Sequence, residues 1–184
     1  TKPFSRDLLL TVVEAALADY KRYLVLQEHL AQSTESLKLI KNAVFEIKTL
    51  AQADGMAAML ANCCPDPQKA VVGLSELLIN AIEHGNLEID FDQKTDLLST
   101  NTWHKYVLEK LSTPPFSNRS VKIELNKLDD KGVIEFIITD EGTGFDWMSL
   151  EDHVSKRVMQ SHGRGILIAK NLSFDSVDFI GSGN

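Results

Sequence analysis

The spacing of apolar residues between 72 and 86 predicts a helix with two unlike faces. Its apolar stripe consists of Leu74, Leu77, Leu78, Ala81 and Ile82. Glu76, Asn80 and Glu83 stand four and then three residues apart, so they share another face. An Asn oxygen suits magnesium, and a carboxylate one turn away can act as a base. By itself, this pattern fits a core helix with a solvated polar face better than it fits a site.

Local signals also predict the elements on the N-terminal side of this helix. Apolar and charged residues alternate over 43–49, which predicts an edge or half-buried strand. Residues 50–62, rich in Ala, Met and Leu, return to a helical pattern. Asp66 and Pro67 suit an N-cap and a first helical position, so the central helix begins there. Gly85 is expected to cap its C-terminal end.

Residues 88–118 form an insert with less regular spacing. A short helix is expected over 92–98, and the apolar residues between 103 and 111 mark a second helix. The pair Pro114-Pro115 ends that helix. The insert shields a ligand, binds a partner or caps the sheet as extra packing, and the sequence leaves these three roles open.

The segment that follows has the alternation of a β-hairpin. Residues 121–125 and 134–138 alternate between apolar and polar side chains on either side of an Asp-Asp-Lys-Gly turn. The second strand runs directly into Asp140. Further along, residues 163–172 predict a helix and residues 176–180 predict another strand.

Three stretches of the chain together resemble the GHKL superfamily of ATP-binding proteins. They are the central helix, residues 138–146 (ITDEGTGFD) and residues 161–170 (SHGRGILIAK). Their Glu-x-x-x-Asn, Asp-x-Gly-x-Gly and Gly-x-Gly motifs occur in the order found in histidine-kinase-like members of this superfamily. The resemblance covers about residues 44–184. It is closest to the anti-sigma-factor serine kinases, because Glu76 stands one turn before Asn80.

The resemblance implies that Asp140 accepts a hydrogen bond from the amino group of adenine. An ionised carboxylate only accepts, so it prefers an amino-bearing purine over one that carries a carbonyl group at that place. Gly142 and Gly144 would let the backbone approach the base without a Cβ clash. Without the other motifs, this segment would be taken for an ordinary Asp-x-Gly turn.

The Gly-x-Gly motif lies at the start of a helix. Gly163 and Gly165 precede an apolar segment whose N-terminal amides and dipole can hold phosphate. His162 and Arg164 can add positive charge there. The chain has no Gly-x-x-x-x-Gly-Lys-Ser/Thr loop and no dinucleotide fingerprint, so phosphate binding would use a different device. In the superfamily, residues 146–161 correspond to an ATP lid, which would be short here.

The polar face of the central helix supplies the candidate metal ligand and base. Asn80 would bind Mg²⁺ through its side-chain oxygen, with phosphates and water completing the coordination shell. By resemblance to the serine kinases, Glu76 would orient or deprotonate the hydroxyl of a substrate serine. In ATPases of the superfamily the matching Glu activates water, so Glu76 alone does not separate phosphotransfer from hydrolysis. Glu83, His84 and Asn86 are further candidates for phosphate contacts.

Residues 5–42 contain no proline or glycine and predict one long helix. From Leu9 to Leu37, residues recur at alternating steps of four and three over about four heptads. The pattern favours a coiled-coil stalk that forms a parallel homodimer, and a single helix lying on the ATP-binding domain is the alternative. His29 lacks the acidic residue and Arg that follow the phosphoacceptor of histidine kinases.

The first residues resemble the end of a response-regulator receiver domain. There, a Lys at the end of the last strand is followed by a Pro and the final helix, as Lys2 and Pro3 are here. A chance occurrence of Lys-Pro-Phe is the alternative. The resemblance implies that residues 1–42 combine the last helix of a receiver with a stalk, and that residues 43–184 are the histidine-kinase-like output domain.

Composition narrows the class of partner and compartment. The chain has 184 residues, of which 43% are hydrophobic and 24% charged, as in ordinary globular proteins. Its net charge of -7 argues against nucleic acid or an anionic membrane as the main partner. No apolar run approaches the roughly 20 residues that span a bilayer, and no signal peptide is evident, which favours the cytoplasm. The adjacent Cys63 and Cys64 suit two reduced thiols better than a disulfide or a zinc site.

The sequence as a whole predicts an α/β two-layer sandwich, with a mixed sheet backed by helices and a long N-terminal helix. We expect ATP and magnesium as cofactors. The expected function is that of an ATP-dependent protein serine/threonine kinase of the anti-sigma-factor type, acting on a protein partner such as an anti-sigma antagonist or a sigma factor. A nucleotide-sensing interaction module without phosphotransfer and the catalytic domain of a histidine kinase are the alternatives.

Overall fold

The structure is a computed structural model in which the chain divides into two units, residues 1–39 and residues 40–184. It describes Leu17, Lys21, 35–128, 131–145, Trp147 and 165–183. In the first unit Leu17, Lys21 and residues 35–37 are helical, and residues 38–39 form a turn. The predicted helix over 5–42 therefore ends earlier than expected, because residues 40–41 are not helical and Asn42 begins a strand. The other residues of the predicted helix and stalk, with Lys2 and Pro3, lie outside the described residues.

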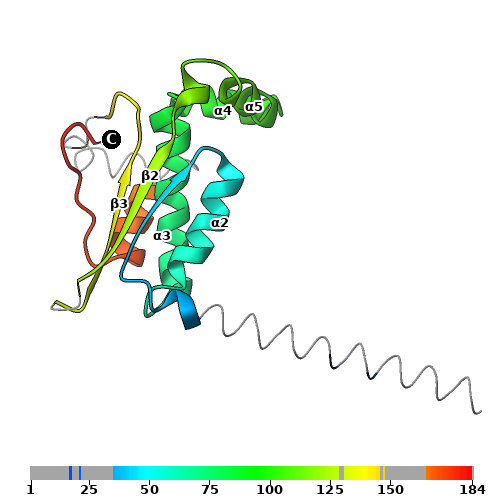
Figure 1. The fold of residues 1–184 in the computed structure, drawn as a ribbon. Coiled ribbons are helices and arrows are strands. Elements are labelled where there is room, and N and C mark those ends of the chain that lie inside the picture. The colour runs from blue at the N-terminus through cyan, green and yellow to red at the C-terminus, as the bar shows by residue number, and fades with distance from the viewer. Residues whose placement is uncertain are drawn as a thin grey trace, which may run out of the picture. The chain divides into compact units, whose positions relative to one another are not determined.

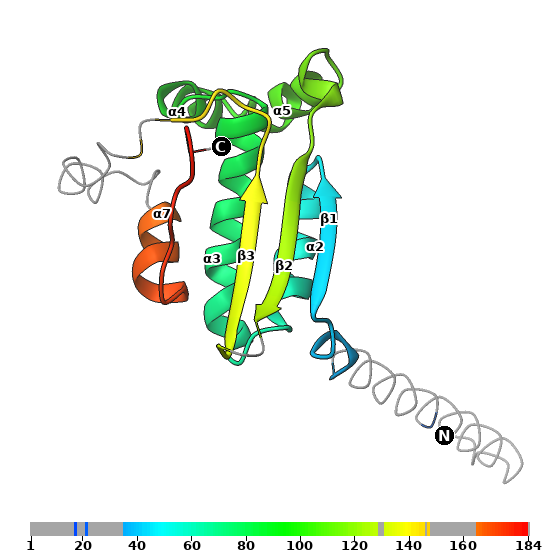
Figure 2. The same cartoon turned by 60° about the vertical axis from the view of Figure 1, so that its left-hand side comes forward.

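The second unit contains an antiparallel sheet of three strands in the described part of the chain. The strands are β1 (Asn42–Ile47), β2 (Val121–Leu128) and β3 (Val133–Thr139), in the order β1-β2-β3 (Figure 2). Phe45 pairs with Ile123, which pairs with Ile138, so these three apolar residues lie on one face of the sheet. The predicted hairpin is confirmed, and β1 lies at an edge of this sheet as expected.

Two expectations about the sheet are wrong for the described residues. The sheet is antiparallel throughout, whereas a mixed sheet was expected. Residues 176–180 run beside β3 in Figures 1 and 2, yet they form no strand. This segment is attached by aromatic side chains, because Phe179 lies 5.3 Å from Phe145 and 6.0 Å from Trp147 between ring centroids. Phe145 and Trp147 belong to the loop after β3, and in the described part of the chain no backbone ladder joins residues 176–180 to the sheet.

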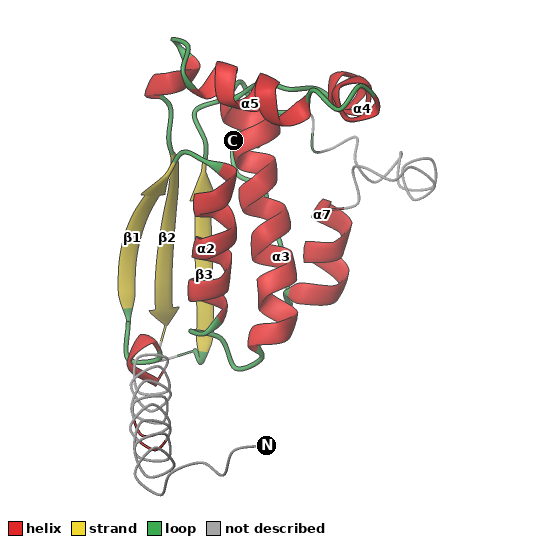
Figure 3. Ribbon diagram, turned by 90° about the vertical axis from the view of Figure 1, so that its right-hand side faces the viewer, coloured by secondary structure: helices red, strands yellow, loops and turns green. Residues whose placement is uncertain are grey.

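Helices cover one face of the sheet (Figures 1 and 3). They are α2 (Leu50–Ala61), α3 (Pro67–Asn80) with its π-helical continuation η1 (Ala81–Asn86), and α7 (Gly165–Ile168) with η3 (Ala169–Ser173). The start of α3 agrees with the prediction, since the Asp66 carboxylate accepts a hydrogen bond from the Lys69 amide at 3.1 Å. The N-cap of α2 is a capping box formed by Thr49 and Gln52.

The hydrophobic core lies between the helices and the sheet. Its largest fully buried side chains include Leu60, Leu74, Leu78, Ile82, Val121, Ile123 and Leu125. They come from the apolar stripe of the helices and from the inner face of β2, which is the two-layer arrangement expected for an α/β domain. None of the helices in the described part of the chain is both long and apolar enough to cross a membrane.

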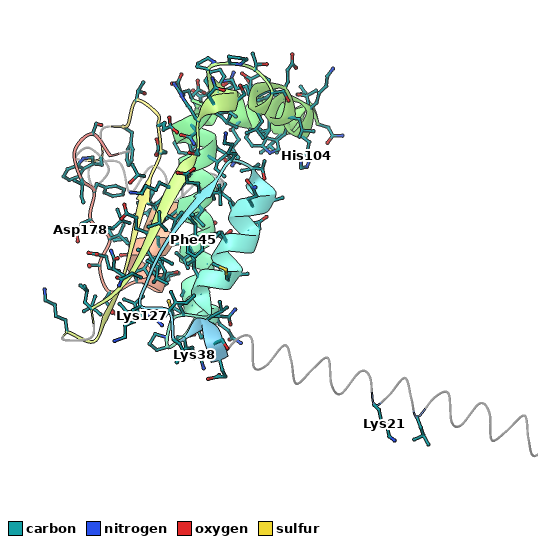
Figure 4. The ribbon with its side chains drawn as sticks, viewed as in Figure 1. Lys21, Lys38, Phe45, His104, Lys127 and Asp178 are labelled. Atoms are coloured by element: carbon teal, nitrogen blue, oxygen red, sulfur yellow. The ribbon has the colours of Figure 1, made fainter. Side chains whose placement is uncertain are left out.

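The insert forms α4 (Phe91–Ser99), α5 (Trp103–Leu111) and the short helix η2 (Phe116–Asn118), which confirms both predicted helices. It caps one end of the two layers: His104 of α5 and Lys127 of β2 lie at opposite ends of the second unit in Figure 4. Trp103 and Val107 are buried, whereas α4 contains no buried residue. The insert therefore packs through buried side chains of α5, and it also makes the polar contacts described below.

Candidate functional site

The end of η1 and the turn after β3 meet through two glycines. A Cβ atom on Gly85 would lie 2.5 Å from Oδ1 of Asp140, and one on Gly142 would lie 2.7 Å from the Gly85 carbonyl carbon. Both distances are shorter than real Cβ atoms tolerate, so each position requires glycine. Gly85 is not the terminal cap that the sequence predicted, because η1 continues to Asn86. It provides the space that Asp140 occupies.

The Asp140 carboxylate is partly engaged within its own turn. Its Oδ1 accepts a hydrogen bond from the Gly142 amide at 2.8 Å. Burial raises the pKa of Asp140, and the Gly142 amide and the charge of Arg119 oppose that rise. Among the described residues, nothing donates a hydrogen bond to the other oxygen, Oδ2. Asp140 therefore retains one acceptor for a ligand.

Asn86 connects this turn to the rest of the domain. Its Oδ1 accepts a hydrogen bond from the Glu141 amide at 2.7 Å, and its main-chain oxygen accepts one from Arg119 at 2.8 Å. The side chain is buried, and its Nδ2 has no hydrogen-bond partner among the described residues. An unpaired buried donor of this kind costs about 1–3 kcal/mol. The sequence suggested Asn86 as a candidate near the phosphates. Its contact with Glu141 was not predictable from local patterns, because the two residues are 55 positions apart in the chain.

Gly165 of the Gly-x-Gly motif contacts Glu76 and Asn80 of the Glu-x-x-x-Asn motif on α3. A Cβ on Gly165 would clash with Oε2 of Glu76 and would lie 3.1 Å from Nδ2 of Asn80. Gly165 is itself buried. Within the described part of the chain, no side-chain hydrogen bond is formed by the Glu76 carboxylate or by the Asn80 carboxamide. His162, Gly163 and Arg164 lie outside the described residues.

Glu83 faces the insert. It is 3% exposed and forms an ion pair with Lys94 of α4, whose Nζ lies 5.2 Å from the centre of the Trp103 ring. Lys110 of α5 donates a hydrogen bond to the Leu87 carbonyl at 2.6 Å, and Arg119 holds the Asn86 carbonyl. Three cations from the insert and the residue after it thus bind the C-terminal end of the α3–η1 helix, where the dipole favours positive charge.

His84 is held by the backbone that follows η1. Its Nδ1 donates a hydrogen bond to the Ile89 carbonyl at 2.5 Å, and its ring centre lies 4.3 Å from that of Phe91. Burial lowers the pKa of His84, which favours the neutral ring. A neutral imidazole with Nδ1 protonated leaves Nε2 as an acceptor, so His84 is poorly suited to neutralise a phosphate.

A cleft of about 1490 Å³ separates the α3 helix from β3 and from the segment that follows η3. Asn80, His84, Asp140 and Gly144 line this cleft together with apolar residues of β3. Glu76, Glu83, Gly142 and Gly165 are not among the described residues that line it. The cleft is larger than the roughly 300–1,000 Å³ of common ligand pockets, so a nucleotide would fill only part of it.

Comparison with protein-family models, with curated proteins and with solved structures finds no significant match to this chain. Functional inference therefore rests on the arrangement of the residues described above.

Proposed function

We propose that residues 43–184 bind Mg-ATP in the manner of the GHKL superfamily and transfer phosphate to a serine or threonine of a protein partner. One observation carries the proposal: the three motifs, which come from distant parts of the chain, meet along a single helix. Asp140 and Gly142 pack on Gly85, and Gly165 packs on Glu76 and Asn80. The first contact lies at the C-terminal end of this helix and the second lies on its polar face, so one element connects residues of all three motifs.

Each side chain has a chemical role in this proposal. Asp140 accepts a hydrogen bond from the amino group of adenine through its unpaired oxygen. Asn80 supplies one oxygen ligand to Mg²⁺, whose remaining ligands are phosphate oxygens and water. In the described part of the chain no group of three or more His, Cys, Asp or Glu side chains gathers into a metal site. A single protein ligand suits Mg²⁺ that arrives with a nucleotide.

Glu76 is the proposed base for the attacking hydroxyl. It lies one turn before Asn80 on the same face of α3, so a hydroxyl beside a Mg²⁺ ion held by Asn80 would be about one helical turn from the Glu76 carboxylate. Glu76→Gln keeps the shape of the side chain and removes the base. Turnover with Mg-ATP and a protein substrate should fall about 100-fold or more while ATP affinity stays the same.

A second candidate is a nucleotide-sensing interaction module that binds ATP without phosphotransfer. One observation favours it: the Glu76 carboxylate packs against Gly165 and is absent from the lining of the cleft. If wild-type protein binds ATP but incorporates no labelled phosphate into any partner and releases none to water, this second candidate replaces the kinase.

Calorimetry with Mg-ATP and Mg-GTP tests adenine-nucleotide binding, which both candidate functions require. Wild type should bind ATP and discriminate against GTP, because the guanine carbonyl oxygen would face the Asp140 carboxylate. Asp140→Ala should abolish ATP binding and leave the thermal transition cooperative. Equal affinity for the two nucleotides, or none for either, contradicts nucleotide binding of this kind.

A further inference from the structure

Asn86 belongs to a ring of hydrogen bonds that includes Glu141, the residue after Asp140. We propose that Asn86 is a positioning residue, which orients Asp140 through this ring and so sets the selectivity for the base. The proposal rests on the nucleotide binding proposed above and assigns the selectivity to a residue outside the three motifs.

The ring joins three segments at one end of the sheet. Asn86 Oδ1 accepts from the Glu141 amide at 2.7 Å, and Glu141 Oε1 in turn accepts from the Ser120 amide at 2.8 Å. Arg119, the neighbour of Ser120, closes the ring by donating to the Asn86 carbonyl at 2.8 Å. The register explains the meeting, since Lys122 pairs with Thr139 and the residues just beyond both strands lie side by side.

The bond from Glu141 to Asn86 controls the backbone of Asp140 directly. The Glu141 N–H belongs to the planar peptide unit that joins Asp140 to Glu141, so holding this amide fixes the ψ angle of Asp140. The next amide, that of Gly142, holds Asp140 Oδ1 at 2.8 Å. With the peptide plane and one carboxylate oxygen both fixed, the remaining oxygen keeps one direction toward a ligand.

The environment of Asn86 indicates that its side-chain oxygen is there to accept the hydrogen bond from the Glu141 amide. The residue is 3% exposed, and its Nδ2 atom has no partner among the residues that the structure describes. A leucine has nearly the same shape as an asparagine and would remove that unpaired donor. The only hydrogen bond that the Asn86 side chain makes within the described residues is the one from Glu141. The buried Asn86 carboxamide thus uses one atom, its oxygen, in a hydrogen bond within the described residues.

The variant pair Asn86→Leu and Asn86→Asp separates this role from packing. Both keep the size of the side chain, but only Asn86→Asp keeps an acceptor oxygen for the Glu141 amide. Asn86→Leu should weaken Mg-ATP binding by about 10-fold or more, bring the ATP-to-GTP affinity ratio toward one, and leave Tm within a few degrees of wild type. Asn86→Asp should restore the ratio. Asn126→Leu, on the outer face of β2, is the matched control and should bind both nucleotides as wild type does.

Calorimetric titration with Mg-ATP and with Mg-GTP distinguishes the possible outcomes. If wild type prefers ATP and Asn86→Leu keeps that preference, the positioning role is wrong while the proposed function stands. If wild type shows no preference, the proposed function and this inference fail together. If Asn86→Leu does not fold, Asn86→Ala removes the same acceptor oxygen for the Glu141 amide with a smaller side chain; an unchanged affinity ratio in that variant overturns the inference.

Discussion

Gly85 and Asp140 are interlocked: the α-carbon of Gly85 lies so close to the Asp140 carboxylate that an added Cβ would be 2.5 Å from Oδ1. Gly85→Ala should therefore displace Asp140 and lower Mg-ATP affinity about 10-fold or more, as measured by calorimetry. Helix propensity alone would predict that Gly85→Ala stabilises the protein, because alanine is favoured over glycine by about 1 kcal/mol in a helix.

Gly55 offers the matched control for that substitution. It lies within α2, and a Cβ there would have no neighbour within 4 Å. Gly55→Ala should raise the free energy of unfolding by about 1 kcal/mol and leave nucleotide binding unchanged. If Gly85→Ala and Gly55→Ala bind Mg-ATP with the same affinity, the space at Gly85 is not needed to position Asp140.

The raised pKa of Asp140 predicts a pH-dependent effect of Asp140→Asn on stability. Burial disfavours the ionised carboxylate in the folded state, so at pH 7 the charge destabilises the native protein. The Asp140→Asn variant, which carries no charge at this position, should melt at a higher temperature than wild type at pH 7. As the pH falls through the folded-state pKa toward the ordinary value of 3.8, wild-type Asp140 becomes protonated and the difference should disappear. A difference that is constant with pH contradicts this account.

The ion pair between Glu83 and Lys94 predicts that the insert is anchored at this point. Lys94→Met would leave the buried Glu83 carboxylate without its cation, and loss of one partner of a buried pair costs about 3–5 kcal/mol. Urea denaturation should show that loss, and the double variant Glu83→Gln, Lys94→Met should recover much of it. Lys122→Met is the control, because its pair with Glu124 is solvent-exposed and should contribute less than about 1 kcal/mol.

Cys63 is buried and Cys64 is half-buried, and both are thiols and not members of a disulfide. Burial raises the pKa of Cys64 to about 11. At pH 8 the native thiol should react with iodoacetamide on the order of 100-fold more slowly than the same thiol in unfolded protein, because the thiolate is the reactive form. Peptide mapping after a timed reaction, with and without denaturant, measures the ratio. Equal rates would mean that Cys64 is more accessible than the structure shows.

Elements whose signals are local were predictable from the sequence alone. Asp66 and Pro67 start α3 because capping involves only the first turn of a helix. The alternation that defines β2 and β3 is likewise a property of short segments, and it correctly predicted which strand ends at Asp140. The order of the three motifs also indicated that distant stretches belong to one candidate site.

Tertiary structure decided what those residues contact. Gly85 looked like a helix cap because local signals carry no information about Asp140, which lies 55 residues away and needs the space of a missing side chain. Glu83 shared a helix face with Glu76 and Asn80, yet its partner is Lys94 of the insert. Residues 176–180 had the alternation of a strand, but a strand requires backbone partners, and the described residues provide no ladder for this segment. In each case the outcome depended on a neighbour brought in by the fold, which short-range sequence patterns do not encode.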